Sequence, residues 1–212
     1  MNESKVIFIS GIDTDAGKSY ATGWLAKELG GRGIRVATMK FIQTGCHGRS
    51  EDIEIHRRIT GTPLPEDTDL TTAPQIFSYP ASPHLAARID RREIDFNAID
   101  AALQRLTQAY DTVLVEGAGG LMVPLTDSML TIDYPRERNL PVALVTNGKL
   151  GSINHTILSL EALASRGMTL HSILYNTRFD TDPVISPDTQ AYLRAYVERH
   201  FPGTPFMLVP TL

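Results

Sequence analysis

A loop rich in glycine and polar residues lies near the N-terminus, from Gly11 to Ser19, and closes with Gly17, Lys18 and Ser19. It follows the apolar run Val6–Ile9 and precedes a helical pattern, so it should join a strand to a helix. Backbone N–H groups in such a loop, and at the start of the helix, stabilise phosphate anions. We therefore predict that the Lys18 ammonium reaches the β/γ-phosphates of a nucleotide and that the Ser19 hydroxyl ligates Mg²⁺.

The spacing in this loop departs from the usual phosphate-binding pattern. Five residues separate Gly11 from Gly17, where the common motif has four. The same residues would also occur in a strand-to-helix turn that needs glycine only for its backbone angles and carries Lys18 and Ser19 by chance. The flanking strand and helix favour nucleotide binding over that alternative.

Three further polar residues each come directly after a short apolar run: Lys40, Glu116 and Asn176. In a parallel sheet the ligand lies in the crevice beyond the carboxyl ends of the strands, so we expect these side chains near the glycine-rich loop. The alternatives are a solvated surface position for Lys40 and a turn-forming role for Asn176.

Two acids are candidate metal ligands. Asp52 begins the helical pattern Asp52–Ile59, and Glu116 ends an apolar run. Together with the Ser19 hydroxyl, their carboxylates would complete an oxygen shell for Mg²⁺. Asp52 could instead be a helix N-cap or a first-turn acid. That alternative is weaker for Glu116, because an acid at the end of a buried strand needs a partner.

The elements that must position these residues alternate along the chain. Short apolar runs occupy residues 6–9, 36–39, 113–115, 142–145 and 173–175, and helical patterns occupy residues 18–29, 96–109, 153–165 and 188–200. This alternation predicts an α/β fold of the P-loop NTPase-like type, with a mostly parallel central sheet and helices on both faces. A length of 212 residues fits a single domain over residues 1–212. Residues 61–83, which contain five prolines, should be the least regular part.

Composition limits the partners. The net charge is -4 and the sequence pI is about 5.8, with no basic stripe, so we expect neither a nucleic acid nor a membrane as partner. Cys46 is the only cysteine, which excludes a disulfide within the chain and a thiolate-rich zinc site. Residues 1–10 show no basic segment followed by a long apolar run, so we expect no secretion signal, and no stretch approaches the roughly 20 apolar residues of a membrane span. A soluble, cytoplasmic protein that acts on small molecules is expected.

Five segments, in this order, resemble the dethiobiotin synthetase family: Gly11–Ser19, Lys40–Gly45, Ser82–His84, Val115–Gly120 and Lys149–His155. The first is similar to the enlarged phosphate loop of that family and has the same five-residue interval. Leu140, Pro141 and Val142 resemble the strand that leads to the last segment. The match spans nearly the whole chain, and five ordered segments are much more specific than any one of them.

The resemblance implies a reaction: 7,8-diaminopelargonate, CO₂ and ATP give dethiobiotin, ADP and phosphate. In the family's scheme an amine of the substrate captures CO₂ as a carbamate, and ATP phosphorylates the carbamate to a mixed anhydride. The second amine then closes the ureido ring. Such an enzyme must hold several anionic groups together, so cations and N–H donors should dominate its site.

The resemblance also assigns roles to residues. Lys40 and Lys18 are the implied catalytic residues, and Ser19, Asp52 and Glu116 the implied metal ligands. ATP contacts are expected from Asp15, Ala16, Gly17, Lys18, Ser19, Tyr20, Asp52, Glu116, Gly117, Ala118, Gly119, Asn176, Thr177, Pro210, Thr211 and Leu212. Substrate contacts are expected from Thr14, Lys40, Thr44, Ser82, Leu150, Gly151 and Asn154. Thr44 and Phe41 stand where the family usually has serine and proline.

Assembly and nucleotide choice follow from the same resemblance. It implies a homodimer in which Leu150–Asn154 of one subunit closes over the partner's substrate. Asn176 is similar to the family's adenine-reading asparagine, whose amide offers a donor and an acceptor to the base. Family members usually continue into another helix after the position of Pro210, whereas this sequence ends at Leu212. We therefore expect few contacts to the base and relaxed nucleotide specificity.

Three alternatives remain open from the sequence. One is a related P-loop amidoligase that uses a different carboxylate, and another is a nucleotide-binding paralogue without synthetase activity. The third is a regulatory switch ATPase that changes shape on hydrolysis. Related switch and metal-insertion ATPases usually carry an additional lysine early in the phosphate loop. No lysine lies between Gly11 and Gly17, which weighs against the switch ATPase.

Overall fold

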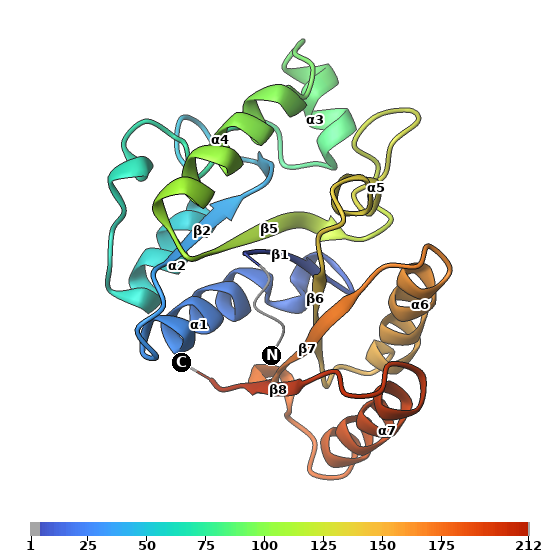
Figure 1. Ribbon diagram of the computed structural model, residues 1–212. Coiled ribbons are helices and arrows are strands. Elements are labelled where there is room, and N and C mark those ends of the chain that lie inside the picture. The colour runs from blue at the N-terminus through green and yellow to red at the C-terminus, as the bar shows by residue number, and fades with distance from the viewer. Residues whose placement is uncertain (1–4, 212) are drawn as a thin grey trace.

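The computed structural model describes residues 5–211, and a parallel six-stranded sheet runs through it (Figure 1). The strand order is β2-β5-β1-β6-β7-β8, and neighbouring strands in this sheet are paired in parallel. The strands are β1 (Val6–Gly11), β2 (Val36–Lys40), β5 (Thr112–Gly120), β6 (Val142–Asn147), β7 (Leu170–Asn176) and β8 (Phe206–Val209). Two short strands, β3 (Gln43–Thr44) and β4 (Ile76–Phe77), form a separate parallel pair. The predicted fold class is confirmed.

Helices follow most of the strands. They are α1 (Lys18–Gly30), α2 (Glu51–Thr60), α3 (Pro83–Ile89), α4 (Phe96–Ala109), α5 (Asp133–Glu137), α6 (Ser152–Ala164) and α7 (Ile185–His200), with the single-turn 3₁₀ helices η1 (Thr14–Ala16), η2 (Pro65–Asp67) and η3 (Thr177–Phe179). The predicted helices correspond to α1, α2, α4, α6 and α7, and their ends differ by at most a few residues. Within residues 5–211, none of these helices combines the length and the apolar character that crossing a bilayer requires.

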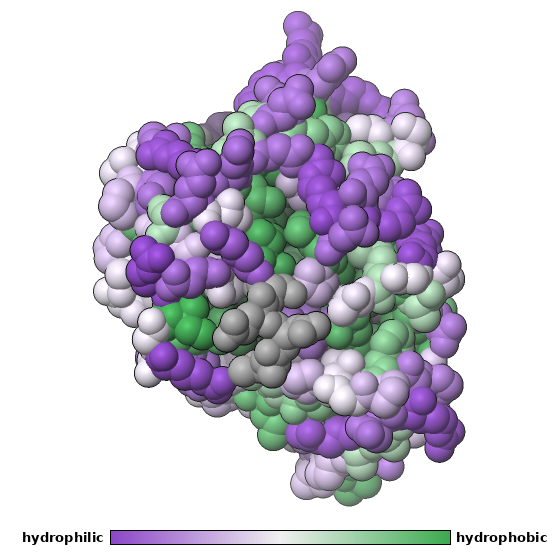
Figure 2. All heavy atoms as spheres, viewed as in Figure 1, coloured by the Kyte–Doolittle hydropathy of each residue, from purple (hydrophilic) through white to green (hydrophobic). Residues whose placement is uncertain are grey.

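Buried side chains divide between the two faces of the sheet. Ile7 and Ile9 of β1 pack on one face against Trp24 and Leu25 of α1, and Phe8 points to the opposite face. That opposite face is covered by the apolar sides of α4, α6 and α7. Figure 2 shows that hydrophilic residues predominate on the outer surface over α3 and α4. Because successive side chains of a strand alternate between faces, an apolar strand needs helices on both, as the sequence predicted.

Local signals set the ends of α2, the helix that carries Asp52. The Ser50 hydroxyl accepts a hydrogen bond from the backbone N–H of Ile53 at the start of the helix, and Gly61, at φ 70°, ends it. Asp52 lies in the first turn, where a negative charge is favourable. Ser50, not Asp52, is therefore the N-cap.

The predicted end of the third apolar run is wrong. Glu116 does not end a strand, because β5 continues through the glycines to Gly120. Glu116 is paired with Ile9 of β1 on one side and with Lys40 of β2 on the other. Gly117–Gly120 carry no side chains that would mark them as strand residues, but β1 remains paired with β5 as far as Gly11 and Gly120. The register places Lys40 beside Glu116.

Candidate active site

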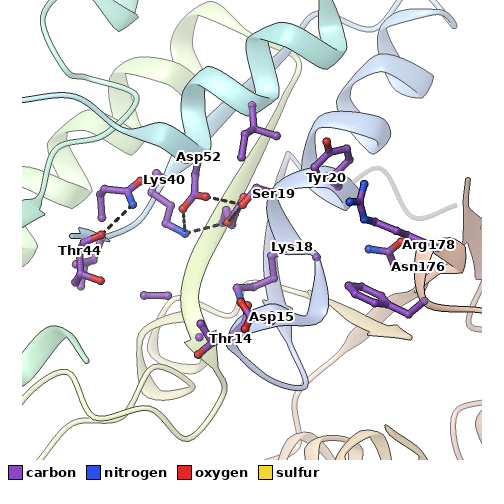
Figure 3. Close-up of a pocket in the computed structure, with 18 residues that line it drawn as sticks. Thr14, Asp15, Lys18, Ser19, Tyr20, Lys40, Thr44, Asp52, Asn176 and Arg178 are labelled. Atoms are coloured by element: carbon purple, nitrogen blue, oxygen red, sulfur yellow. Dashed lines mark hydrogen bonds and ion pairs between the residues drawn. The ribbon is translucent and has the colours of Figure 1, made fainter. Parts of the chain in front are cut away.

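A cavity of about 460 Å³ opens at the carboxyl ends of β1, β2, β5 and β7 (Figure 3). Many of the residues predicted from the sequence line it: Thr14, Asp15, Gly17, Lys18, Ser19, Tyr20, Lys40, Thr44, Asp52, Glu116, Ala118, Gly119 and Asn176. Ile42, Gln43, Ile55, Arg178 and Phe179 also line it and were not predicted. The topology thus brings together segments that are far apart in the sequence, as expected for a parallel sheet.

The phosphate loop is held in shape by close contacts. Gly17 has φ 91°, and a Cβ at this position would collide with the side-chain amide of Asn176, so both backbone angle and space require glycine. The Lys18 ammonium folds over the loop and donates to the carbonyls of Asp13 and Thr14, both at 3.0 Å. Burial, and then the nearby charge of Lys40, lower the pKa of Lys18 to about 8. A phosphate anion in the cavity would favour the charged form of Lys18.

Lys40 lies between two carboxylates. Its Nζ is 2.5 Å from Asp52 Oδ2 and 2.9 Å from Glu116 Oε1, and it also donates to the carbonyl of Gly117 at 3.1 Å. Burial acts to lower the pKa of Lys40, but the charges of Glu116 and Asp52 outweigh it and raise the pKa above its usual value. Lys40 is therefore a fixed positive charge beside the phosphate loop.

Glu116 is fully buried and ionised. Burial acts to raise its pKa, but the charge of Lys40 and the hydrogen bond from His56 hold the pKa well below its usual range. A buried charge is tolerated only when it is paired and hydrogen-bonded, and Glu116 meets both conditions.

The oxygen atoms suited to a divalent cation converge on Ser19. Its Oγ lies 2.6 Å from Asp52 Oδ1 and 3.0 Å from Glu116 Oε1. These three hard oxygen donors come from α1, α2 and β5, and they fit Mg²⁺. Residues 5–211 contain no group of three or more His, Cys, Asp or Glu side chains arranged to chelate a metal. Two carboxylates and one hydroxyl leave positions around Mg²⁺ for nucleotide phosphates and water, which this ion usually keeps as ligands.

His56 contacts the same cluster and was not predicted. Its Nε2 lies 2.7 Å from Glu116 Oε2 and its Nδ1 lies 3.0 Å from Thr38 Oγ1, with the ring completely buried. His56 follows Asp52 by four residues on α2, so both lie on the same side of the helix. That spacing is the signal by which it could have been found.

The end of the cavity farthest from Lys40 is formed around η3 (Figure 3). Asn176 donates from Nδ2 to the carbonyl of Ala16 at 3.4 Å, and its Oδ1 accepts from the backbone N–H of Arg178 at 3.1 Å. The Arg178 guanidinium lies 5.7 Å from the ring centroid of Tyr20, and the Lys149 ammonium lies 4.1 Å from that of Phe179. This end offers flat π surfaces and positive charge.

Comparison with known proteins shows which family the chain resembles. The family model described as an AAA domain matches residues 5–203. The ATP-dependent dethiobiotin synthetase BioD 2 of Pasteurella multocida is 50% identical to the chain over 204 residues, which cover 96% of each. BioD of Chlorobaculum tepidum is 48% identical over 93% of this chain and 83% of its own length.

The chain belongs to the dethiobiotin synthetase family. The resemblance carried by the five sequence segments is thus confirmed. Among solved structures, a ParA family ATPase from Chlorobium tepidum has a TM-score of 0.52 at 17% identity, covering 97% of this chain and 84% of its own. FtsY from Elizabethkingia anophelis has a TM-score of 0.51 at 16% identity, covering 97% and 58%. These two similarities show that the fold is shared.

Several residues expected in the dethiobiotin synthetase site do not line the cavity in this chain: Ala16, Gly117, Ser82, Leu150, Gly151, Asn154, Thr177, Pro210 and Thr211. Ala16 and Gly117 take part through the carbonyls already described. Thr177 donates from its hydroxyl to the carbonyl of Val209 at 2.9 Å, so it ties η3 to β8. Leu150 is 92% exposed. Leu212 lies outside the described residues, and the predicted roles of all these residues stay predictions.

Proposed function

We propose that the protein is a dethiobiotin synthetase that joins 7,8-diaminopelargonate and CO₂ at the expense of Mg·ATP. Family membership supports the reaction, and one observation links it to this chain's own residues. Two buried lysines, Lys18 from the phosphate loop and Lys40 from β2, face one cavity with a cluster of hard oxygen donors between them. Such a site suits phosphoryl transfer between anionic groups.

The nucleotide phosphates would lie along the loop at the start of α1. Lys18 would exchange its two carbonyl acceptors for phosphate oxygens, which are stronger acceptors because they are charged. Ser19, Asp52 and Glu116 would hold Mg²⁺, which would neutralise charge on the nucleotide phosphates. Asp15, Gly17 and Tyr20 complete the proposed nucleotide contacts on this side.

Lys40 would stabilise the negative charge of the phosphoryl group during its transfer from ATP to the carbamate. One substrate amine attacks CO₂ and loses a proton to give a carbamate, and a carbamate oxygen takes the γ-phosphoryl group as ADP leaves. The second amine then attacks the carbamate carbon, and phosphate leaves with the oxygen that had been phosphorylated. Lys40 is charged and fixed by two carboxylates, so it is placed to stabilise the migrating phosphoryl group without moving. Thr14 and Thr44 face the same space and are proposed to hold the carbamate or an amine.

We further propose that the chain acts as one domain and as a cytoplasmic homodimer. Leu150 is exposed beside Gly151 and the start of α6, where the partner's substrate is expected. If sites are shared, mixing the Lys40→Ala and Asn154→Ala variants should regenerate activity in hybrid dimers. No recovery despite proven subunit exchange would argue for sites made within one chain.

The test of the function is product formation. The protein is mixed with diaminopelargonate, bicarbonate and Mg·ATP, and dethiobiotin is followed by mass spectrometry, with the diamine left out as control. The proposal predicts dethiobiotin and ADP in equal amounts, and no ADP without the diamine. ATP turnover that is independent of the diamine would instead indicate a switch ATPase.

A further inference from the structure

A chain of hydrogen bonds runs from the protein surface to the buried carboxylate of Glu116. Arg57 donates from Nη1 to Thr38 Oγ1 at 2.8 Å, Thr38 Oγ1 is 3.0 Å from His56 Nδ1, and His56 Nε2 is 2.7 Å from Glu116 Oε2. His56 and Glu116 are completely buried, and Thr38 nearly so. Arg57 is itself anchored by Asp67, through Nε at 2.7 Å and Nη2 at 2.8 Å.

The donors and acceptors of this chain fix its direction. Arg57 can only donate and an ionised Glu116 can only accept, so both ends are determined. Because the Thr38 oxygen accepts from Arg57, its own O–H is free to donate to His56 Nδ1. Because the ionised Glu116 can only accept, His56 Nε2 carries a proton and donates it to Glu116. With this assignment every group in the chain is satisfied.

The two oxygens of Glu116 therefore have different partners. Oε2 is occupied by His56, whereas Oε1 faces Ser19 and Lys40 at 3.0 and 2.9 Å. Without His56 the carboxylate would keep its charge but would lose the hydrogen bond that sets its orientation. In metal sites, a side chain that binds the metal is commonly oriented by a hydrogen bond from a neighbouring residue that does not itself touch the metal.

We propose that His56 is a positioning residue that holds Glu116 so that a single oxygen, Oε1, faces the metal and the phosphates. The inference deepens the proposed function and rests on it only for the identity of the metal. His56 does not contact the cavity itself, because it is not among the residues that line it. It acts through Glu116, and Thr38 acts through His56 by holding the ring in place through its contact with Nδ1.

Two pairs of variants separate positioning from packing. Glutamine places its amide nitrogen near the position of His Nε2, so His56→Gln keeps a donor for Glu116. Asparagine reaches only the position of Nδ1, so His56→Asn keeps a polar group near Thr38 and loses the donor. Thr38→Val removes the hydroxyl that holds His56 Nδ1. Thr22→Val is its matched control, because the Thr22 hydroxyl is buried and has no hydrogen-bond partner in the described structure.

The experiment measures binding, not turnover. Each protein is saturated with a non-hydrolysable ATP analogue, and Mn²⁺ affinity is followed by electron paramagnetic resonance, with melting temperature measured in parallel. We expect His56→Asn to weaken Mn²⁺ binding by at least tenfold and Thr38→Val by a smaller factor. His56→Gln should stay within about threefold of the unmodified protein, and Thr22→Val should not change the affinity.

Two results would overturn the inference: equal Mn²⁺ affinity in all variants, or equal losses in His56→Asn and His56→Gln that follow only their melting temperatures. The outcome is separable from that of the proposed function, because the binding measurement contains no diamine. If the protein makes no dethiobiotin but the order of Mn²⁺ affinities holds, the proposed reaction fails and the positioning role stands. If dethiobiotin forms but the affinities are equal, the reaction stands and the positioning role is wrong.

Discussion

The two ends of the cavity are built in different ways. We call the end that contains Lys18 and Lys40 the phosphate end. There Lys40 of β2 forms ion pairs with Asp52 of α2 and Glu116 of β5 and donates a hydrogen bond to the Gly117 carbonyl. The other end is formed by Tyr20, Asn176, Arg178 and Phe179, and we call it the base end because we propose that it holds the nucleotide base. Here the Arg178 guanidinium lies 5.7 Å from the centroid of the Tyr20 ring. Lys40 and Glu116 are buried, whereas the side chains of Tyr20 and Arg178 are partly or largely exposed.

Under the proposed function, the difference follows from what each end would do, which is to stabilise the phosphoryl group or to hold the nucleotide base. Stabilising a moving charge requires donors and cations held in one orientation before the reaction, which buried and multiply bonded groups provide. Holding a base requires only affinity, and π surfaces with a nearby cation provide it with little discrimination between bases. We therefore expect substitutions at the phosphate end to alter catalysis and those at the base end to alter affinity.

The largest effects are expected from the two lysines. Lys18→Ala and Lys40→Ala should each lower kcat/KM on the order of 10³-fold or more, because each removes a fixed cation from the transferring phosphoryl group. Nucleotide binding, measured by calorimetry, should be lost only in Lys18→Ala. Since removing Lys40 leaves Glu116 without its cation, Lys40→Gln and melting temperatures control for unfolding. Near-normal turnover of the Lys40 variants at saturating substrate would make the catalytic assignment wrong.

The carboxylates should show the next largest effect. Asp52→Asn and Glu116→Gln nearly preserve side-chain shape but remove charge from the hard-cation site, so the Mg²⁺ concentration at half-maximal activity should rise by about tenfold or more. A magnesium titration measures this directly. Asp69→Asn is a suitable control, because Asp69 pairs with Arg105 and does not line the cavity. An unchanged magnesium dependence in both variants would leave Asp52 and Glu116 with structural roles only.

Nucleotide choice is a more moderate effect and tests the base end. We predict that CTP, GTP and UTP support dethiobiotin synthesis with kcat/KM within about a hundredfold of that with ATP, a difference of roughly 2.7 kcal/mol. Arg178→Ala should raise the KM for all four triphosphates by similar factors and leave kcat nearly unchanged. The measurement is kcat/KM for each triphosphate at saturating diamine and Mg²⁺. A larger preference for ATP would show that Asn176 and its neighbours form a selective adenine pocket.

The smallest predicted effect concerns Asp67, which anchors Arg57 behind the phosphate end. Burial acts to raise the pKa of Asp67, but hydrogen bonds from Arg57 and Leu64 lower it below its unfolded value. The ion pair therefore stabilises the fold above the unfolded pKa, and this contribution is lost as pH falls through the folded pKa. Asp67→Asn should lower the free energy of unfolding by about 1 kcal/mol at neutral pH, less than for a buried pair because Asp67 is partly exposed. Urea unfolding at several pH values should show the difference shrinking below about pH 4, whereas a difference independent of pH would contradict the assignment.

Much of the cavity could be predicted because the information is local. Lys18 and Ser19 follow a glycine at a strand-to-helix turn, and Lys40 and Asn176 each follow an apolar run. In a parallel sheet such positions necessarily converge, so residue type and strand position together were sufficient. The same reasoning placed Glu116 in the cavity even though the end of its strand was wrong.

The missed features depend on contacts that local patterns do not encode. The four-residue spacing from Asp52 puts His56 on the same side of α2, but only the fold shows that Glu116 lies against it. Arg178 follows Asn176 and Thr177 as an ordinary loop residue, and only the position of Tyr20 gives it a partner. The short strand β8 was missed because four residues after Pro205 carry little periodicity, and it forms only because β7 presents a free edge.

The central claim is that the phosphoryl group passes to a carbamate and not to water, and the fate of oxygen tests it directly. Freshly dissolved CO₂ labelled with ¹⁸O is mixed with diaminopelargonate and Mg·ATP in a single turnover, before the label exchanges with water, and both products are analysed by mass spectrometry. If the carbamate is phosphorylated, one labelled oxygen leaves with phosphate and the other remains in the ureido carbonyl of dethiobiotin. If instead the fourth oxygen of the phosphate comes from water and carries no label, ATP is hydrolysed separately and the account is contradicted.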